Sequence, residues 1–141
     1  MFTIDASVWV NAESPGEPSY DLSRRLLDKL IALRAQIIVP TLLPIELAGA
    51  ISRVRGDIAL AADMASAMLA LPTLRFIALD ERLARTSAEL AARNRLRGAD
   101  EVYAAVALTY RCELVSLDHE HLTRLKTVVS TITPLEALAK I

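Results

Sequence analysis

The sequence is poor in several residue types that would point to particular classes of protein. Its 141 residues include one cysteine, Cys112, so no internal disulfide can form, and this usage is typical of a reducing compartment. Aromatic residues make up only 4 % of the chain and hydrophobic residues 53 %, so we expect an aliphatic, helix-rich core. The net charge of −1 gives no broad basic field for nucleic acid, and no run of like charge suggests disorder.

No targeting or membrane-spanning segment is evident in the sequence. The opening residues MFTIDASVWV lack the basic start of a signal peptide and contain an acid at position 5. The longest weakly polar stretch, residues 58–71, is interrupted by Asp63 and is too short to span a bilayer. We therefore expect a single cytoplasmic domain over residues 1–141, long enough to bury a sizeable core.

Short apolar segments alternate with helical patterns along the chain. Strands are predicted at residues 2–4, 37–39, 74–79, 113–117 and 127–132, and helices at 20–34, 42–54, 57–71, 81–95, 99–110, 119–125 and from 134 onward. The helix that begins near residue 99 has no charge between 102 and 108, which predicts burial on nearly all sides. This alternation predicts an α/β fold, a parallel sheet with helices on both faces.

Four acids lie where a predicted strand ends or a predicted helix begins. Asp5 follows the first strand and Asp118 follows the fourth. Glu46 lies in the first turn of a mostly apolar helix, and Asp100 opens the charge-free helix. In parallel sheets, ligands bind beyond the carboxyl ends of the strands, where the strand order switches direction. If the first strand lies between the second and the fourth, the four acids converge at that edge.

Each acid alone also has an ordinary structural explanation. Asp100 and Asp118 could cap helices, and Asp5 could form a local turn with Ser7. Asp80 also follows a strand, but the third strand is expected outside the second, roughly 10 Å from the first. Asp80 is therefore predicted to be a helix cap only.

Four clustered carboxylates need compensation for their mutual repulsion. At an effective dielectric constant of about 20, two unit charges about 4 Å apart repel each other by roughly 4 kcal/mol. Either some of the acids take up protons, or a hard cation lies between them. An oxygen-only ligand set favours Mg²⁺ or Mn²⁺ over zinc, and such ions can activate a water and stabilise the leaving oxygen of a phosphodiester. His119 and His121 suggest a rival zinc site, but the chain has no third histidine to complete it.

Four segments carry a resemblance to a known family. In this order, TIDASVWVNA, VPTLLPIELAGAI, RGADEVYAAVAL and ELVSLDHEHL resemble the segments of a PIN domain, the metal-dependent ribonuclease fold of VapC-type toxins. The resemblance runs from Asp5 to the last strand and implies a five-stranded parallel sheet in the order 3-2-1-4-5. It also implies a Mg²⁺- or Mn²⁺-dependent endoribonuclease, the toxin of a toxin–antitoxin pair, with an RNA substrate, an antitoxin partner and a homodimeric state.

The resemblance also implies roles for individual residues. Asp5, Asp100 and Asp118 resemble the family's metal-binding aspartates, and Glu46 resembles the glutamate that helps to hold the ion or orient water. The catalytic set expected from the resemblance is thus these four acids. The resemblance implies supporting roles for three further residues. Ser7 matches a hydroxyl residue near the first aspartate, Ser116 stands where the family often has threonine, and Glu120 stands where a further acid sometimes occurs.

Residues around the start of the charge-free helix extend this expectation. Arg93, Arg95 and Arg97 precede it and could meet RNA phosphates, although a solvated helix end is their ordinary explanation. Glu101 is turned about 100° around the helix from Asp100, so we expect it to be solvated or to support the site from behind.

Two other classes of function stay open. A PIN-like module could bind RNA or protein and cut poorly, although the intact acids weigh against this. A phospho-acceptor receiver domain also clusters acids on a doubly wound sheet. Such a domain needs a lysine near the site late in the chain, whereas Lys126 lies past the fourth strand and does not end the fifth.

Overall fold

The computed structural model describes residues 1–96 and 99–141, and its strands and helices alternate largely as the sequence predicts. The strands are β1 (Phe2–Ile4), β2 (Ile37–Pro40), β3 (Leu74–Ile77), β4 (Glu113–Val115) and β5 (Thr131–Ile132). The helices are α1 (Ala6–Asn11), α2 (Tyr20–Ala32), α3 (Leu43–Arg55), α4 (Ile58–Leu69), α5 (Glu81–Asn94), α6 (Asp100–Tyr110), α7 (His119–Arg124) and α8 (Pro134–Leu138). Across the described part of the chain, none of the helices has the length and apolar character needed to cross a membrane.

The five strands form one parallel sheet in the order β3-β2-β1-β4-β5, which confirms the topology that the resemblance implied. β1 lies at the centre, where Ile4 pairs with Val115 of β4. The backbone N–H of Asp5 donates to the Val115 carbonyl at 3.0 Å. Because parallel strands end at the same edge of a sheet, the residues that follow β1 and β4 become neighbours.

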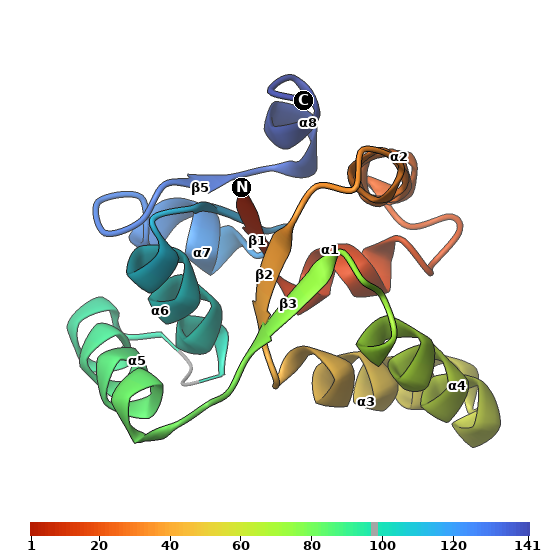
Figure 1. The fold of residues 1–141 in the computed structure, drawn as a ribbon, viewed down its shortest axis with the longest axis horizontal. Coiled ribbons are helices and arrows are strands. Elements are labelled where there is room, and N and C mark those ends of the chain that lie inside the picture. The colour runs from red at the N-terminus through yellow and green to blue at the C-terminus, as the bar shows by residue number, and fades with distance from the viewer. Residues whose placement is uncertain (97–98) are drawn as a thin grey trace.

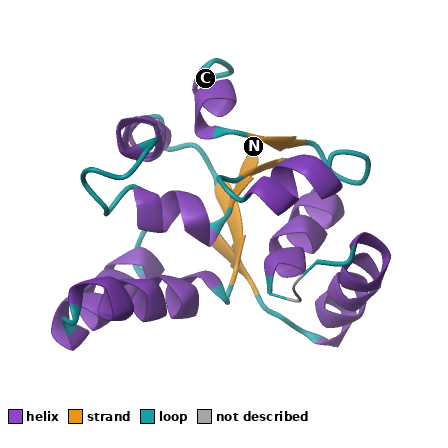
Figure 2. Cartoon of the chain, turned by 180° about the vertical axis from the view of Figure 1, so that it is seen from behind, coloured by secondary structure: helices purple, strands orange, loops and turns teal. Residues whose placement is uncertain are grey.

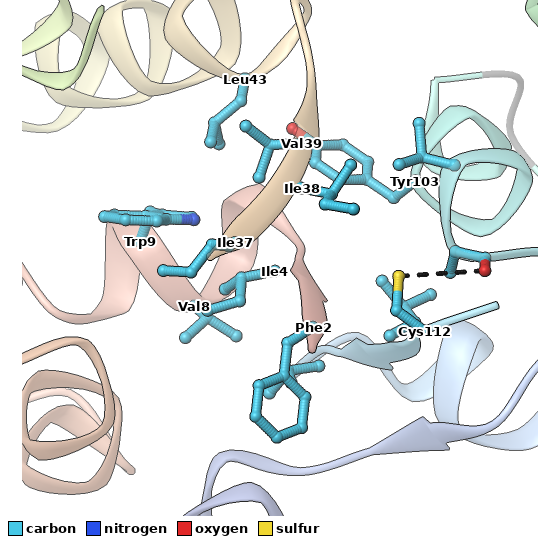
Figure 3. Close-up of a cluster of buried hydrophobic side chains, with 14 of the residues drawn as sticks. Phe2, Ile4, Val8, Trp9, Ile37, Ile38, Val39, Leu43, Tyr103 and Cys112 are labelled. Atoms are coloured by element: carbon cyan, nitrogen blue, oxygen red, sulfur yellow. Dashed lines mark hydrogen bonds between the residues drawn. The ribbon is translucent and has the colours of Figure 1, made fainter. Parts of the chain in front are cut away.

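Helices cover both faces of the sheet (Figure 1). The sheet runs through the centre of the view, with α1 to α4 on one side and α5 to α7 on the other. Figure 2 shows the same two layers of helices from behind. In the core, Val8 and Trp9 lie on one side of β1 and β2, and Tyr103 and Cys112 lie on the other (Figure 3).

Helix α6 is the most deeply buried helix. All residues from 101 to 107 are buried, which confirms the prediction made from its charge-free run. Glu101 lies inside this run and is fully buried, so the expectation that it could be solvated is wrong. Because residues 101–107 are all buried, this part of α6 has no solvated face on which to place this carboxylate.

Two predictions of secondary structure are wrong, and the boundaries of other elements differ by a few residues. The sequence predicted no helix at α1, which begins directly after Asp5. The predicted strand at 127–132 is limited to β5, because the backbone N–H groups of Val128 and Val129 both donate to the Leu125 carbonyl and form a turn. The predicted helix break at Gly98 and the side chain of Arg97 fall outside the described residues.

Candidate active site

Asp5 is held rigidly at the carboxyl end of β1. It is the N-cap of α1, and its Oδ2 accepts hydrogen bonds from the Ser7 backbone N–H at 3.1 Å and from the Ser7 hydroxyl. The Ser116 hydroxyl donates to the same oxygen at 3.2 Å. The turn with Ser7 that the sequence allowed is therefore present. The other oxygen, Oδ1, makes no hydrogen bond within the described residues.

Ser116 connects Asp5 to the segment after β4. Its buried Oγ accepts the backbone N–H of Asp118 at 3.0 Å and lies 2.9 Å from Nδ1 of His121. Because the single hydroxyl proton goes to Asp5, Nδ1 of His121 is the donor in the last contact. Ser7 makes a similar link, since its Oγ accepts the backbone N–H of Leu117 at 3.1 Å. Both serines therefore tie the loops after β1 and β4 together.

Asp118 acts as a helix cap, as its ordinary explanation required. Its Oδ1 accepts the backbone N–H of Glu120 at 2.6 Å at the start of α7, and its Oδ2 makes no hydrogen bond within the described part of the chain. The carboxylate of Glu120 lies 3.3 Å from the guanidinium of Arg124 in an i,i+4 pair. Capping thus occupies one oxygen of Asp118 and leaves the second unbonded.

Glu46 faces the other acids from the first turn of α3. Its Oε2 accepts a hydrogen bond from the hydroxyl of Tyr103 on α6, at 2.5 Å. Burial raises the pKa of Glu46 above its ordinary value, the Tyr103 hydrogen bond opposes the rise, and the negative charges of Asp5 and Asp100 add to it. The same environment also raises the pKa of Tyr103, mainly through burial. Glu46, Asp5 and Asp100 therefore lie within one shared electrostatic field.

Asp100 is the first residue of α6, and it is not the N-cap. The N-cap position is Ala99, which has no side-chain cap bond, so the capping explanation for Asp100 is not supported. Behind it, Glu101 is fully buried, and neither of its carboxylate oxygens has a hydrogen-bond partner in the described structure. Nε2 of buried His121 is likewise without a partner. Burial raises the pKa of Glu101, His121 lowers it and Asp100 raises it further.

A groove of about 1090 Å³ opens beside Glu46, and the described lining includes Glu46 but not Asp5, Asp100 or Asp118. Ser7 and Glu46 line it together with residues of α1, the turn after α1, and α3. It continues to the end of α3, where Arg53 and Arg55 form part of its lining. The sequence predicted no role for these two arginines.

Other predicted residues do not form part of the groove lining. Asp80 caps α5 through the backbone N–H of Leu83 at 2.8 Å, on the outer side of β2, as predicted for a simple cap. Arg93 and Arg95 are exposed at the end of α5, and neither lines the groove. Their role as RNA contacts stays a prediction.

The chemistry of the donor set fits a hard divalent cation. Asp5, Glu46 and Asp118 each use one carboxylate oxygen in a hydrogen bond and keep the second free of hydrogen bonds within the described residues. Oxygen donors of this kind suit Mg²⁺ or Mn²⁺. Among residues 1–96 and 99–141, however, no three histidine, cysteine, aspartate or glutamate side chains already form a group that could hold an ion. His119 and His121 likewise belong to no such group among the described residues, so the rival zinc site is not formed there either.

Comparison with known proteins places the chain in one family. The model of the PIN domain family matches residues 2–127. No curated protein sequence matches the chain. The match to the PIN domain family leaves no support for the receiver-domain alternative. Lys126, the lysine considered for that alternative, is exposed in the turn after α7.

Solved structures with the same fold include a toxin and a toxin–antitoxin complex. The structure of Mycobacterium tuberculosis VapC20, a sarcin–ricin loop cleaving toxin, is similar at 16 % identity with a TM-score of 0.75, over 92 % of this chain and 96 % of that one. FitAcB from Neisseria gonorrhoeae is similar at 17 % identity with a TM-score of 0.71, over 96 % and 99 %. VapBC2 from Rickettsia felis, bound to a promoter DNA fragment, is similar at 14 % identity with a TM-score of 0.68, over 94 % and 97 %. With a parallel sheet in the order 3-2-1-4-5, acids at its carboxyl edge and a family match over residues 2–127, the chain belongs to the PIN domain family.

Proposed function

We propose that this protein is a Mg²⁺- or Mn²⁺-dependent endoribonuclease and the toxin of a toxin–antitoxin pair. The observation that carries the proposal is the gathering of Glu46, Asp5 and Asp100 at the edge of the sheet where parallel folds bind ligands. Burial raises the pKa of Glu46, and the negative charges of Asp5 and Asp100 raise it further. Structural support alone would not require repelling acids in one place. A site that binds a cation does require them.

In this proposal, Asp5, Glu46, Asp100 and Asp118 hold the metal through carboxylate oxygens. When bound, such an ion supplies the positive charge that activates water and stabilises the leaving oxygen of the phosphodiester. Since no complete group of three ligands is present among the described residues, binding involves some adjustment of these side chains.

The chain's own residues orient the acids. The hydroxyls of Ser7 and Ser116 donate to Oδ2 of Asp5 and leave Oδ1 available to a ligand. The Tyr103 hydroxyl likewise donates to Oε2 of Glu46 and leaves Oε1 available. Holding a carboxylate in one rotamer reduces the entropy that is lost when it binds a ligand. The groove that opens beside Ser7 and Glu46 provides space for an RNA strand.

The toxin role is supported by the similar structures, which include toxin–antitoxin complexes. The expected partner is an antitoxin protein, which a small gene next to this one would encode. We also expect a homodimer. On α4, Ile58 and Leu69 are 78 % and 58 % exposed, which is more apolar surface than a monomer needs. Sedimentation at micromolar concentration tests this, and a monomer would contradict it.

An RNA cleavage assay tests the proposed activity. The native protein should cut RNA with Mg²⁺ or Mn²⁺ and not with EDTA, and a DNA of the same sequence serves as a control. A sarcin–ricin loop hairpin belongs among the RNAs, because VapC20 is described as cleaving that loop. Asp100→Asn should abolish cleavage, and the cap variant Asp80→Asn should retain it. Undiminished cleavage by Asp100→Asn or in EDTA would contradict the proposal, and inactivity on every RNA would favour a PIN-like binding module.

A further inference from the structure

The groove beside the acids extends well beyond the reacting centre. One wall is the face of α3, and the other is α1 with the turn that follows it. Glu46, Gly49 and Arg53 all line it, at the spacing that places residues on one face of a helix. With a rise of about 1.5 Å per residue, Arg53 lies about 10 Å along the helix axis from Glu46.

Gly49 gives the guanidinium of Arg53 a close approach to the helix. A Cβ atom built at Gly49 would lie 3.2 Å from Nη1 of Arg53, which is closer than nearly all real contacts of this kind. The guanidinium therefore lies against the helix surface at the groove. Arg53 has no ion pair within the described part of the chain, so its charge is not neutralised by a carboxylate there.

Arg55 places a second positive charge at the same end of the groove. Its Nη2 donates to the backbone carbonyl of Glu13, which lies just beyond α1. The carboxylate of Glu13 is already paired with Arg24 at 3.0 Å, so it does not neutralise Arg55. Glu17, in the turn after α1, also lines the groove and has no ion pair among the described residues, so the two arginines outnumber it. The groove thus runs from an acidic end to a cationic end.

We propose that Arg53 and Arg55 form a subsite for a backbone phosphate of the RNA, a short distance along the strand from the bond that is cut. The inference rests on the proposed function, because the acids place the reacting phosphate at the other end of the groove. RNA brings a negative charge at every nucleotide toward four carboxylates, and two guanidinium groups that have no ion pair in the described structure offset that repulsion. Guanidinium groups also match phosphate oxygens in a planar, two-point geometry.

The salt dependence of RNA binding tests the subsite without any need for cleavage. Anisotropy of a labelled single-stranded RNA of about 12 nucleotides is measured in EDTA over a series of salt concentrations. For single strands, each phosphate contact contributes about 0.7 to the slope of log affinity against log salt. The Arg53→Gln/Arg55→Gln double variant should lose about 0.7 or more of the slope. Arg53→Lys, which keeps the charge, should retain most of it.

Arg25→Gln is the matched control, because Arg25 is exposed on α2, outside the groove, and has no ion pair in the described structure. Gly49→Ala is an independent variant that leaves every charge in place. It should weaken RNA binding by moving the Arg53 guanidinium, and alanine within a helix favours folding.

The subsite would be overturned if the double variant kept the salt-dependence slope of the native protein, or lost no more of that slope than Arg25→Gln does. The groove would then be a candidate binding site for a protein segment instead of RNA. If the native protein still cleaves RNA in that case, only the subsite fails. If it binds RNA with the expected slopes and cleaves none, the subsite stands and the nuclease proposal fails. Absence of RNA binding by the native protein would overturn both.

Discussion

The buried carboxylate of Glu101 should reduce the stability of the metal-free protein. The side chain is fully buried, and neither oxygen has a hydrogen-bond partner in the described structure. Burial raises its pKa above the ordinary value of 4.5, and the charge of Asp100 raises it further, although His121 opposes the rise. Glu101→Gln keeps the shape of the side chain and removes the charge.

The size of the effect is the difference between burying a charge and burying a neutral amide, because glutamine keeps unsatisfied polar atoms and removes only the charge. An unsatisfied buried polar group typically costs about 1–3 kcal/mol, and a charged one costs more. We therefore expect Glu101→Gln to raise the free energy of unfolding by about 1–3 kcal/mol at neutral pH. For a chain of this length, that corresponds to a rise in Tm of about 3–10 °C. Glu89→Gln, on the exposed side of α5, is the control and should change the stability little.

The pH dependence of the difference identifies its cause. An acid whose pKa is raised in the folded state holds more protons when folded, so the native protein loses stability as the pH rises from the ordinary pKa through the folded-state pKa. The advantage of Glu101→Gln should therefore be full at high pH and should disappear as the pH falls toward 4.5.

Urea unfolding in EDTA, repeated at several pH values, measures this difference. A variant that is less stable than the native protein at neutral pH would refute the reasoning and would show that His121 compensates the carboxylate. A difference that does not vary with pH would refute the assignment to a titrating charge.

Variants at three further positions test the contacts of the acids, by urea unfolding in EDTA and by the cleavage assay. Tyr103→Phe removes the donor to Glu46 and should lower the free energy of unfolding by about 1–3 kcal/mol in urea; an unchanged value would show that the hydrogen bond contributes nothing. Ser116→Ala should slow cleavage by releasing Asp5 and Ser116→Thr should preserve the rate, whereas equal loss in both would implicate packing instead. Asp118→Asn should lose cleavage but remain as stable as the native protein, because asparagine also caps helices. Asp118→Ala should lose cleavage and also about 1 kcal/mol of the free energy of unfolding. Cleavage by Asp118→Asn at the native rate would show that Asp118 is only a cap.

Much of the architecture could be predicted from the sequence because the strands are short and apolar and the helices between them are amphipathic. The missed helix α1 shows the limit of periodicity, because Val8 and Trp9 are adjacent, apolar and buried on a helix of only six residues. Such a segment resembles a strand in composition. Asp5 and Ser7 carried the one available signal, a capping turn that indicates a helix start.

The strand predicted at 127–132 was too long for a related reason. Val128 and Val129 favour strands, but their N–H groups are used in a turn that closes α7. Tertiary context overrides such preferences, since Val129 is buried without pairing to another strand.

In the candidate site, sequence order identified the acids but not the groove. Each acid follows a strand or opens a helix, so the chain itself marks them. The RNA-binding candidates Arg93, Arg95 and Arg97 were chosen because they precede Asp100 in sequence, and the structure shows Arg93 and Arg95 exposed at the end of α5. Arg53 follows Glu46 by seven residues, two turns along one helix face, and that spacing could have identified it.

The burial of Glu101 could also have been inferred from the sequence. A helix predicted to be buried nearly all round leaves few exposed positions in its first turn. Rotation from Asp100 gave the direction of the side chain but not its surroundings, because these include His121 of α7, and because α6 packs against β1 and β2, which are far away in sequence. Such contacts are accessible only from the three-dimensional structure.

The most direct test of the account is a Mn²⁺ titration of the purified protein, with free Mn²⁺ followed by electron paramagnetic resonance. The native protein and Asp80→Asn should bind Mn²⁺ equally, because Asp80 only caps α5. Asp5→Asn and Asp100→Asn should weaken binding by about tenfold or more, since each removes a proposed ligand. Equal binding by all four proteins, or no binding by the native protein, would contradict the claim that these acids form a metal site.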